Sequence, residues 1–103
     1  MADATYATSP GGVIAAVVYA SRLAKVLRLV RPRLAGITLG SHVYFLRERA
    51  LVNDASLRHE LAHVDQWHRL GVVRFLALYL WQTLRVGYQA NPFEVEARAA
   101  EYP

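Results

Sequence analysis

The residues best suited to chemistry are His59, Glu60 and His63, which form the motif His-Glu-Leu-Ala-His. Two histidines four positions apart on a helix lie on one face, and imidazole nitrogens are common zinc ligands. Glu60 lies about 100° around the same helix, where its carboxylate can accept a proton from a metal-bound water. The motif therefore predicts a zinc site with Glu60 as general base. The simpler alternative is two partly exposed histidines on an ordinary surface helix.

A third metal ligand must come from elsewhere, because catalytic zinc has three protein ligands and one open position. The chain has no cysteine, and after the motif its acidic residues are Asp65, Glu94, Glu96 and Glu101. Asp65 is two positions past His63 and so points to the opposite side of the helix. The remaining acids all belong to the segment NPFEVEARAAE. Helical geometry alone slightly favours Glu96 over Glu94, because Phe93, Ala97 and Ala100 mark the buried face and Glu96 lies nearer its centre.

The motif HELAH, followed later in the chain by NPFEVEA, resembles the gluzincin zinc metallopeptidases. The small size most resembles the minimal members of that family, the minigluzincins. The resemblance implies that His59, His63 and Glu94 bind one zinc ion per chain and that Glu60 is the base. In the family an alanine follows three residues after the glutamate ligand, and Ala97 matches that position.

The resemblance covers residues 37–101 and departs from the family at Arg98, where many relatives have an acid or an amide. Another group must therefore orient a ligand histidine. The family also implies that a substrate peptide adds to an edge strand, for which residues 42–46 are the candidate. A further donor is needed for the transition-state oxyanion, and Tyr88, His68 or an arginine could supply it. Tyr88, which precedes the glutamate helix, is preferred, with a tyrosine that only caps the core as the alternative.

The elements that must position these residues can be predicted from the sequence around the motif. Asn53 and Asp54 predict the start of the motif helix, and Gly71 predicts its end. Before it, β-branched and aromatic residues on both sides of a glycine predict a hairpin of residues 37–39 and 42–46.

Two further helices are predicted after the motif helix. Residues 72–88 are apolar on most sides of a helix, which predicts a buried element. Asn91 and Pro92 then predict the start of a last helix that ends near Glu101.

The N-terminal part is predicted to hold a flexible segment and a helix. Residues 1–11 are small and polar and end in turn-forming residues. Residues 13–30 have amphipathic spacing, which predicts a basic-faced helix terminated by Pro32. Residues 12–103 are therefore predicted to form one α+β domain with about four helices and a two- or three-stranded antiparallel sheet, a minimal zincin-like core.

Charge and hydropathy restrict the partners. The net charge is +4, but the arginines are spread from Arg22 to Arg98, which argues against nucleic-acid binding. The apolar runs at residues 12–20 and 72–81 are too short for a transmembrane segment, and the first lacks a basic leader. We expect a cytoplasmic protein, peripheral to a membrane at most, that acts on a peptide or an unstructured protein. The oligomeric state is open.

The sequence thus predicts a minimal zinc metallopeptidase that cleaves peptide bonds with a zinc-bound water activated by Glu60. One alternative is a latent or inactive zinc-binding scaffold, which does not need the Glu60 carboxylate. The other is a basic interaction module in which residues 12–33 contact a membrane surface or an acidic partner.

Overall fold

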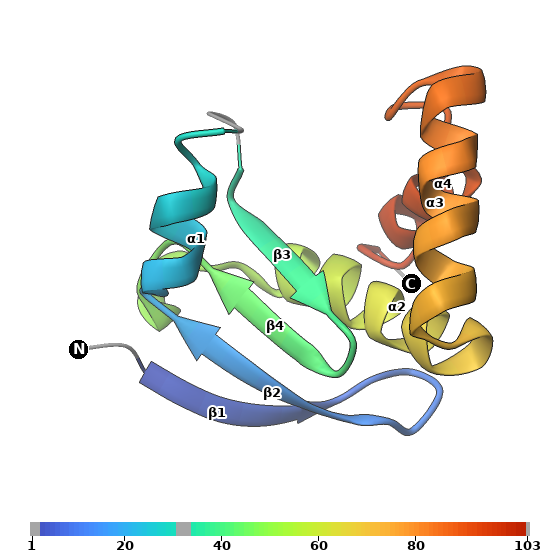
Figure 1. Ribbon diagram of the computed structural model, residues 1–103. Coiled ribbons are helices and arrows are strands. Elements are labelled where there is room, and N and C mark those ends of the chain that lie inside the picture. Colours follow the sequence, from blue (N-terminus) through green and yellow to red (C-terminus); the bar gives the residue numbers. More distant parts are fainter. Residues whose placement is uncertain (1–2, 31–33, 103) are drawn as a thin grey trace.

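The computed structural model describes residues 3–30 and 34–102, which combine four α-helices with a four-stranded sheet (Figure 1). The strands are β1 (Asp3–Thr8), β2 (Ile14–Tyr19), β3 (Gly36–Leu39) and β4 (His42–Phe45). The helices are α1 (Arg22–Leu27), α2 (Asp54–Leu70), α3 (Val72–Val86) and α4 (Pro92–Ala99), with a short 3-10 helix at Arg49–Leu51. The predicted single α+β domain is confirmed.

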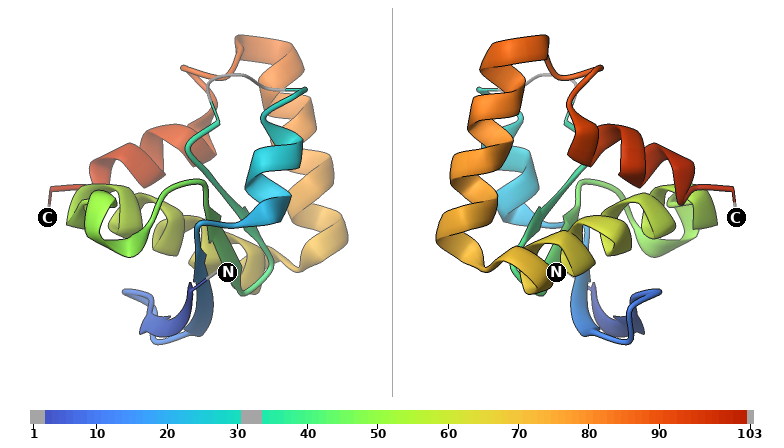
Figure 2. Two further views of the ribbon diagram at one scale, coloured as in Figure 1. Left: turned by 90° about the vertical axis from the view of Figure 1, so that its left-hand side faces the viewer. Right: turned by 90° about the vertical axis from the view of Figure 1, so that its right-hand side faces the viewer.

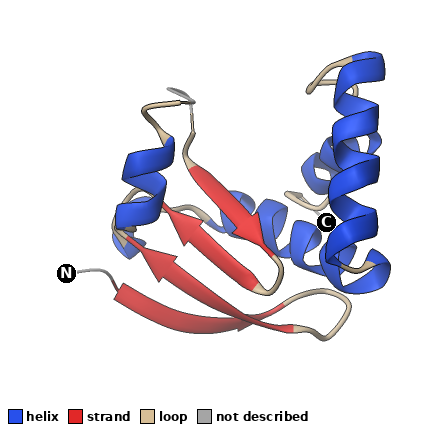
Figure 3. Ribbon diagram, in the orientation of Figure 1, coloured by secondary structure: helices blue, strands red, loops and turns tan. Residues whose placement is uncertain are grey.

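The sheet is larger than predicted and is not purely antiparallel (Figure 3). Its strand order is β1-β2-β4-β3, with β2 and β4 parallel and the two outer pairs antiparallel. The predicted hairpin of β3 and β4 is confirmed. The prediction of two or three antiparallel strands is wrong, because β1 and β2 come from residues expected to be a flexible segment and a helix.

Strand β2 replaces the first turns of the helix predicted from residue 13. A short apolar run is compatible with either a helix or a strand, and the valines here favour the strand. Ala15, Val17 and Tyr19 are buried while the residues between them are less so, which is the alternation of a strand. The helix is confined to the six residues of α1. Its predicted end, Pro32, lies outside the described residues.

Strand β1 lies where a flexible segment was predicted, and it pairs with β2 along its whole length. The loop between these strands is fastened to α2 by Asp65, which accepts hydrogen bonds from the Ser9 hydroxyl and, at 2.9 Å, from the Gly11 amide. A Cβ added at Gly11 would lie 2.7 Å from Asp65 Oδ1, so a side chain at this position would displace the Asp65 carboxylate. The prediction that residues 1–11 form no secondary-structure element is therefore wrong for the described part of that segment.

The motif helix has the predicted ends. Asn53 caps α2 by accepting a hydrogen bond from the Ser56 amide, and Gly71 follows its last turn with a φ of 80°. Helix α2 packs its Leu61 and Val64 against the sheet, in a core with Ala15, Val17, Tyr19, Val43 and Phe45. Helix α4 lies along α2, and α3 rises beside them (Figure 2). The motif is therefore held between the sheet and the C-terminal helix.

Helix α3 was predicted to be buried, and this prediction is wrong. Phe75 is its only buried residue, whereas Val73 and Leu84 are 82% and 84% exposed. The helix contacts the rest of the described chain through Phe75 and Tyr79 on its inward side and leaves most of its apolar residues in solvent. No helix in the described part of the chain is long and apolar enough to cross a membrane.

Candidate metal centre

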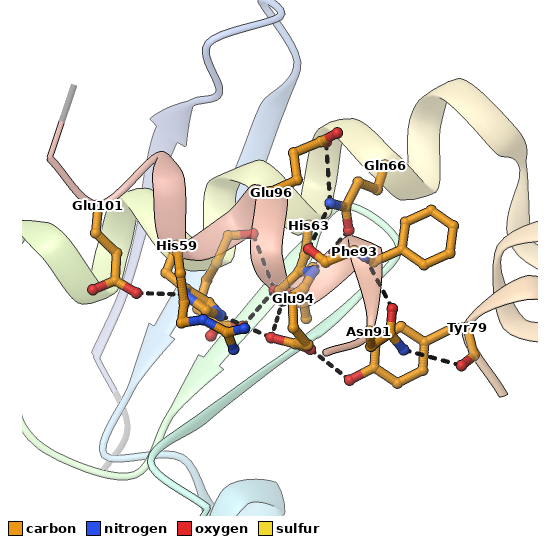
Figure 4. Close-up of polar contacts among 12 residues, drawn as sticks. His59, His63, Gln66, Tyr79, Asn91, Phe93, Glu94, Glu96 and Glu101 are labelled. Carbon is orange, nitrogen blue, oxygen red and sulfur yellow. Dashed lines mark hydrogen bonds and ion pairs between the residues drawn. The ribbon is translucent and has the colours of Figure 1, made fainter. Parts of the chain in front are cut away.

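His59, His63 and Glu94 meet between α2 and α4 (Figure 4). The Nε2 atom of His59 is 3.1 Å from Glu94 Oε1, and the Nε2 atom of His63 is 3.2 Å from the same oxygen. One ligand atom from each residue lies within 4.8 Å of the others. Because the three groups converge and are at most slightly exposed, they could hold a metal ion.

Helix α4 turns its two glutamates to different sides. Glu94 is 3% exposed and faces the two histidines. Glu96 lies at the surface, where its Oε1 is 3.1 Å from Gln66 Nε2 and 3.5 Å from Arg69. Ala97 is fully buried, which allows α4 to lie close to α2. The candidate ligand set therefore contains Glu94 and not Glu96.

A second group of side chains orients the two imidazoles. His59 Nδ1 is 2.8 Å from Glu101 Oε2, and His63 Nδ1 is 2.8 Å from Gln66 Oε1. Each contact occupies the Nδ1 atom of an imidazole and leaves its Nε2 atom to bind a metal. Arg98 turns away and donates to the Gln89 carbonyl. Glu101 and Gln66 thus take the orienting role for which Arg98 is unsuited.

Gln66 and Glu101 were not identified as orienting residues from the sequence. For Gln66 a local signal exists, because residues three apart on a helix are neighbours and Gln66 follows His63 at that spacing. Glu101 reaches His59 only because α4 lies along α2, and its backbone carbonyl accepts a hydrogen bond of 2.7 Å from Arg58 Nε. No local pattern in the sequence indicates the contact between Glu101 and His59.

Helix α3 also contributes to the position of Glu94. The Tyr79 hydroxyl donates to Glu94 Oε2 at 2.5 Å. Asn91, which is fully buried, caps α4 by accepting from the Phe93 amide and donates to the Tyr79 carbonyl at 3.1 Å and to Thr83 Oγ1 at 2.9 Å. Asn91 was predicted only as a helix start, and Tyr79 was not identified. Together they tie the ligand-bearing helix to α3.

Glu60 lies beside the three candidate ligands without belonging to them. The Thr38 hydroxyl on β3 donates to Glu60 Oε1 at 2.8 Å and is 3.2 Å from the Glu60 carbonyl oxygen. This contact orients the carboxylate from the sheet side. Glu60 also lines the same pocket as His59, His63 and Glu94.

The pocket lies between β3 and α3 and includes Tyr88, which is 37% exposed. Its other lining residues are Gly36, Ile37, Thr38, Leu39, Trp67, Phe75, Leu76 and Tyr79. Residues 42–46 were expected to be the edge strand beside the site, but β4 lies inside the sheet between β2 and β3. The strand at the sheet edge that lines the pocket is β3, so the proposed peptide-binding edge moves to that strand.

The metal-free site is a charged cluster. Burial is the largest influence on the pKa of His59 and would lower it, but hydrogen bonds to Glu94 and Glu101 and nearby negative charge raise it to about 9. The same balance between burial and Glu94 raises the pKa of His63. Burial would raise the pKa of Glu94, but hydrogen bonds from both histidines hold it well below the ordinary 4.5. A metal ion must therefore displace protons from the imidazoles.

These shifts predict how the stability of the metal-free protein depends on pH. The raised pKa of His59 stabilises the fold fully below the ordinary value of 6.5, and this contribution is lost as the pH rises towards about 9. The lowered pKa of Glu94 stabilises the fold above the ordinary 4.5 and is lost below it. Chelator-treated protein should therefore have its highest melting temperature between these two ordinary values. A melting temperature that rises between pH 6.5 and 9 would contradict the charged cluster.

A matched pair of variants separates the cluster from general charge effects. Glu101→Gln removes one carboxylate that contacts His59 and should flatten the loss of stability above pH 6.5. Glu96→Gln removes a carboxylate of α4, five residues before Glu101, that contacts neither histidine, and it should leave the pH profile unchanged.

No protein-family model, curated protein or solved structure matches this chain. The resemblance to gluzincins consequently rests on the motif residues, and function must be argued from the chemistry of the site.

Proposed function

We propose that the protein is a small zinc metallopeptidase of the gluzincin type. The observation that carries the proposal is the convergence of two imidazole nitrogens and one carboxylate oxygen, with Glu60 and an edge strand beside them. Ligands of a tetrahedral zinc ion are about 3.3 Å apart when each bond is about 2.0 Å. The distances of 3.1 and 3.2 Å from the two Nε2 atoms to Glu94 Oε1 fit that spacing.

Zinc bound there would act as a Lewis acid that makes water nucleophilic near neutral pH and polarises the scissile carbonyl. His59 and His63 would hold the ion in their neutral forms, donating Nδ1–H to Glu101 and Gln66. Glu60 would take the proton from the attacking water and pass it to the leaving amine. Its hydrogen bond from Thr38 keeps the carboxylate directed into the pocket.

The pocket walls support a peptide substrate. Strand β3 borders β4 on one side and lies at the sheet edge, so a peptide in extended form can add to it through backbone hydrogen bonds. Gly36 at its start offers backbone without a side chain beside the pocket. Tyr88 also lines the pocket, and its hydroxyl is our candidate donor to the oxyanion of the transition state.

The two alternatives make different demands on the chain. A zinc-binding scaffold would need the three ligands but not Glu60, so the oriented Glu60 carboxylate favours the enzyme. The basic module was based on a long helix over residues 13–30, of which only the six residues of α1 are helical. That alternative has therefore lost the element on which it depended.

The proposed function is tested by zinc content and proteolysis. Purified protein should contain close to one zinc ion per chain, and His59→Ala or His63→Ala should lose most of it because two ligands cannot complete the site. The zinc-loaded protein should cleave an unfolded protein substrate, with the products identified by mass spectrometry. A chelator should stop cleavage and added zinc restore it. Full zinc content in both variants would rule out the site. Zinc binding without cleavage would contradict the peptidase and leave the zinc-binding scaffold as the function.

A further inference from the structure

The outward side of α3 carries an apolar stripe that the described fold leaves uncovered. Phe75 and Tyr79 face the rest of the molecule. The stripe consists of Val73, Leu76, Leu80, Trp81 and Leu84, which are 82%, 43%, 60%, 59% and 84% exposed. At about 100° per residue these five side chains share one side of the helix. Such a continuous exposed stripe is typical of a surface that binds something.

The charges beside the stripe are all positive. Arg74 and Arg85 lie about 20° and 40° beyond Trp81 on the helix, next to the stripe and away from the buried side. Both arginines are exposed. No acidic residue occurs in the sequence between Asp65 and Glu94, so the helix and its flanks carry no negative side chain. The ligand of this surface should therefore be apolar and anionic.

We infer that α3 binds the surface of an anionic lipid bilayer. An amphipathic helix with leucine and tryptophan on one side and arginine at the border lies in the interface, with its apolar side at the acyl boundary and its cations among phosphates. The 15 residues of α3 offer about 22 Å of such a helix. A second copy of the chain fits less well, because it would bring the same arginines together without an acid on either helix to pair with them.

This inference does not depend on zinc or on peptidase activity. Leu76 belongs both to the stripe and to the lining of the pocket beside the candidate metal centre. Binding through α3 would therefore place the pocket beside the lipid surface, whatever reaction occurs there.

Vesicle binding tests the inference with the full chain. Wild-type protein should sediment with vesicles of mixed phosphatidylglycerol and phosphatidylcholine, less with phosphatidylcholine alone, and less at high salt. Trp81→Ser combined with Leu84→Ser should weaken binding by at least about tenfold. Arg74→Gln and Arg85→Gln should each weaken it by about fivefold. Tyr6→Ser is the matched control, since Tyr6 is 79% exposed on β1 and should bind normally.

Fluorescence and two further variants make the outcome decisive. Binding should shift Trp81 emission to shorter wavelength while Trp67, which is 7% exposed, stays unchanged. Glu60→Gln should bind as wild type does. Absence of wild-type binding would overturn the inference, as would an equal loss in Tyr6→Ser. Loss in Leu29→Ser without loss in the α3 double variant would move the contact to the turn after α1, where Leu29 is 84% exposed. A dimer that only the α3 variant dissociates, without vesicle binding, would make a second copy the occupant.

Discussion

Glu60→Gln is expected to reduce peptide-bond cleavage by about 100- to 10,000-fold while leaving zinc content unchanged. Glutamine keeps the shape of the side chain but cannot accept a proton from the attacking water. Metal content should persist because Glu60 is outside the converging set of His59, His63 and Glu94. The measurement is the initial rate of cleavage at saturating zinc, with metal content determined on the same samples.

Glu96→Gln is the control for this substitution. It makes the same chemical change on a neighbouring helix, but Glu96 contacts Gln66 and Arg69 at the surface and does not line the pocket. Its turnover should equal that of the wild type. If Glu60→Gln also retains full turnover with full zinc, Glu60 is not the base and the proposed reaction has to be abandoned.

Local signals were sufficient to predict the motif helix. A capping asparagine at Asn53 and a glycine at Gly71 determine backbone conformations through contacts within a few residues, so their effect is readable in the sequence. The hairpin of β3 and β4 was readable for the same reason, because its strands are separated only by a tight turn. The relative positions of His59, Glu60 and His63 then followed from the helical period.

Strands β1 and β2 were mispredicted because their structure depends on distant partners. The run of residues 14–19 is apolar throughout, and alternation appears only in the burial of Ala15, Val17 and Tyr19 once β2 pairs with β4. Parallel pairing of this kind joins segments separated by a helix and another strand, and no local pattern specifies it. The loop before β2 depends in turn on Asp65, which belongs to α2.

The candidate site likewise combines residues that a local pattern predicts with residues that only the packing of distant elements brings in. His59, His63 and Glu60 are set by one helix, and Glu94 was chosen from the family resemblance. Apart from Gln66 on the motif helix itself, the groups that orient them come from other elements: Thr38 from β3, Tyr79 from α3 and Glu101 from the residues after α4. Their roles follow from how the helices and the sheet pack, so they could be found only from the structure.

Glu94→Ala is expected to weaken zinc binding by at least about tenfold, whereas Glu96→Ala should change it little. Both histidine Nε2 atoms lie within 3.2 Å of Glu94 Oε1, so alanine removes the group on which the site converges. The Glu96 side chain is 53% exposed and reaches the site only through Gln66. Gln66 Nε2 also donates to the Phe93 carbonyl at 2.9 Å, so it should still orient His63 when Glu96 is absent.

Titration of both variants with zinc against a competing chelator, at one fixed pH, measures the difference. Circular dichroism on the same samples establishes that each variant is folded, which matters because metal-free Glu94→Ala leaves the buried His63 and the partly buried His59 without their shared carboxylate. A folded Glu94→Gln variant gives a second test, since the amide fills the same space but is a much weaker zinc ligand. If instead Glu96→Ala lost the greater affinity, the third ligand would be Glu96. The fully buried Ala97, three residues after Glu94, would then have no part in setting the distance between α4 and the motif helix.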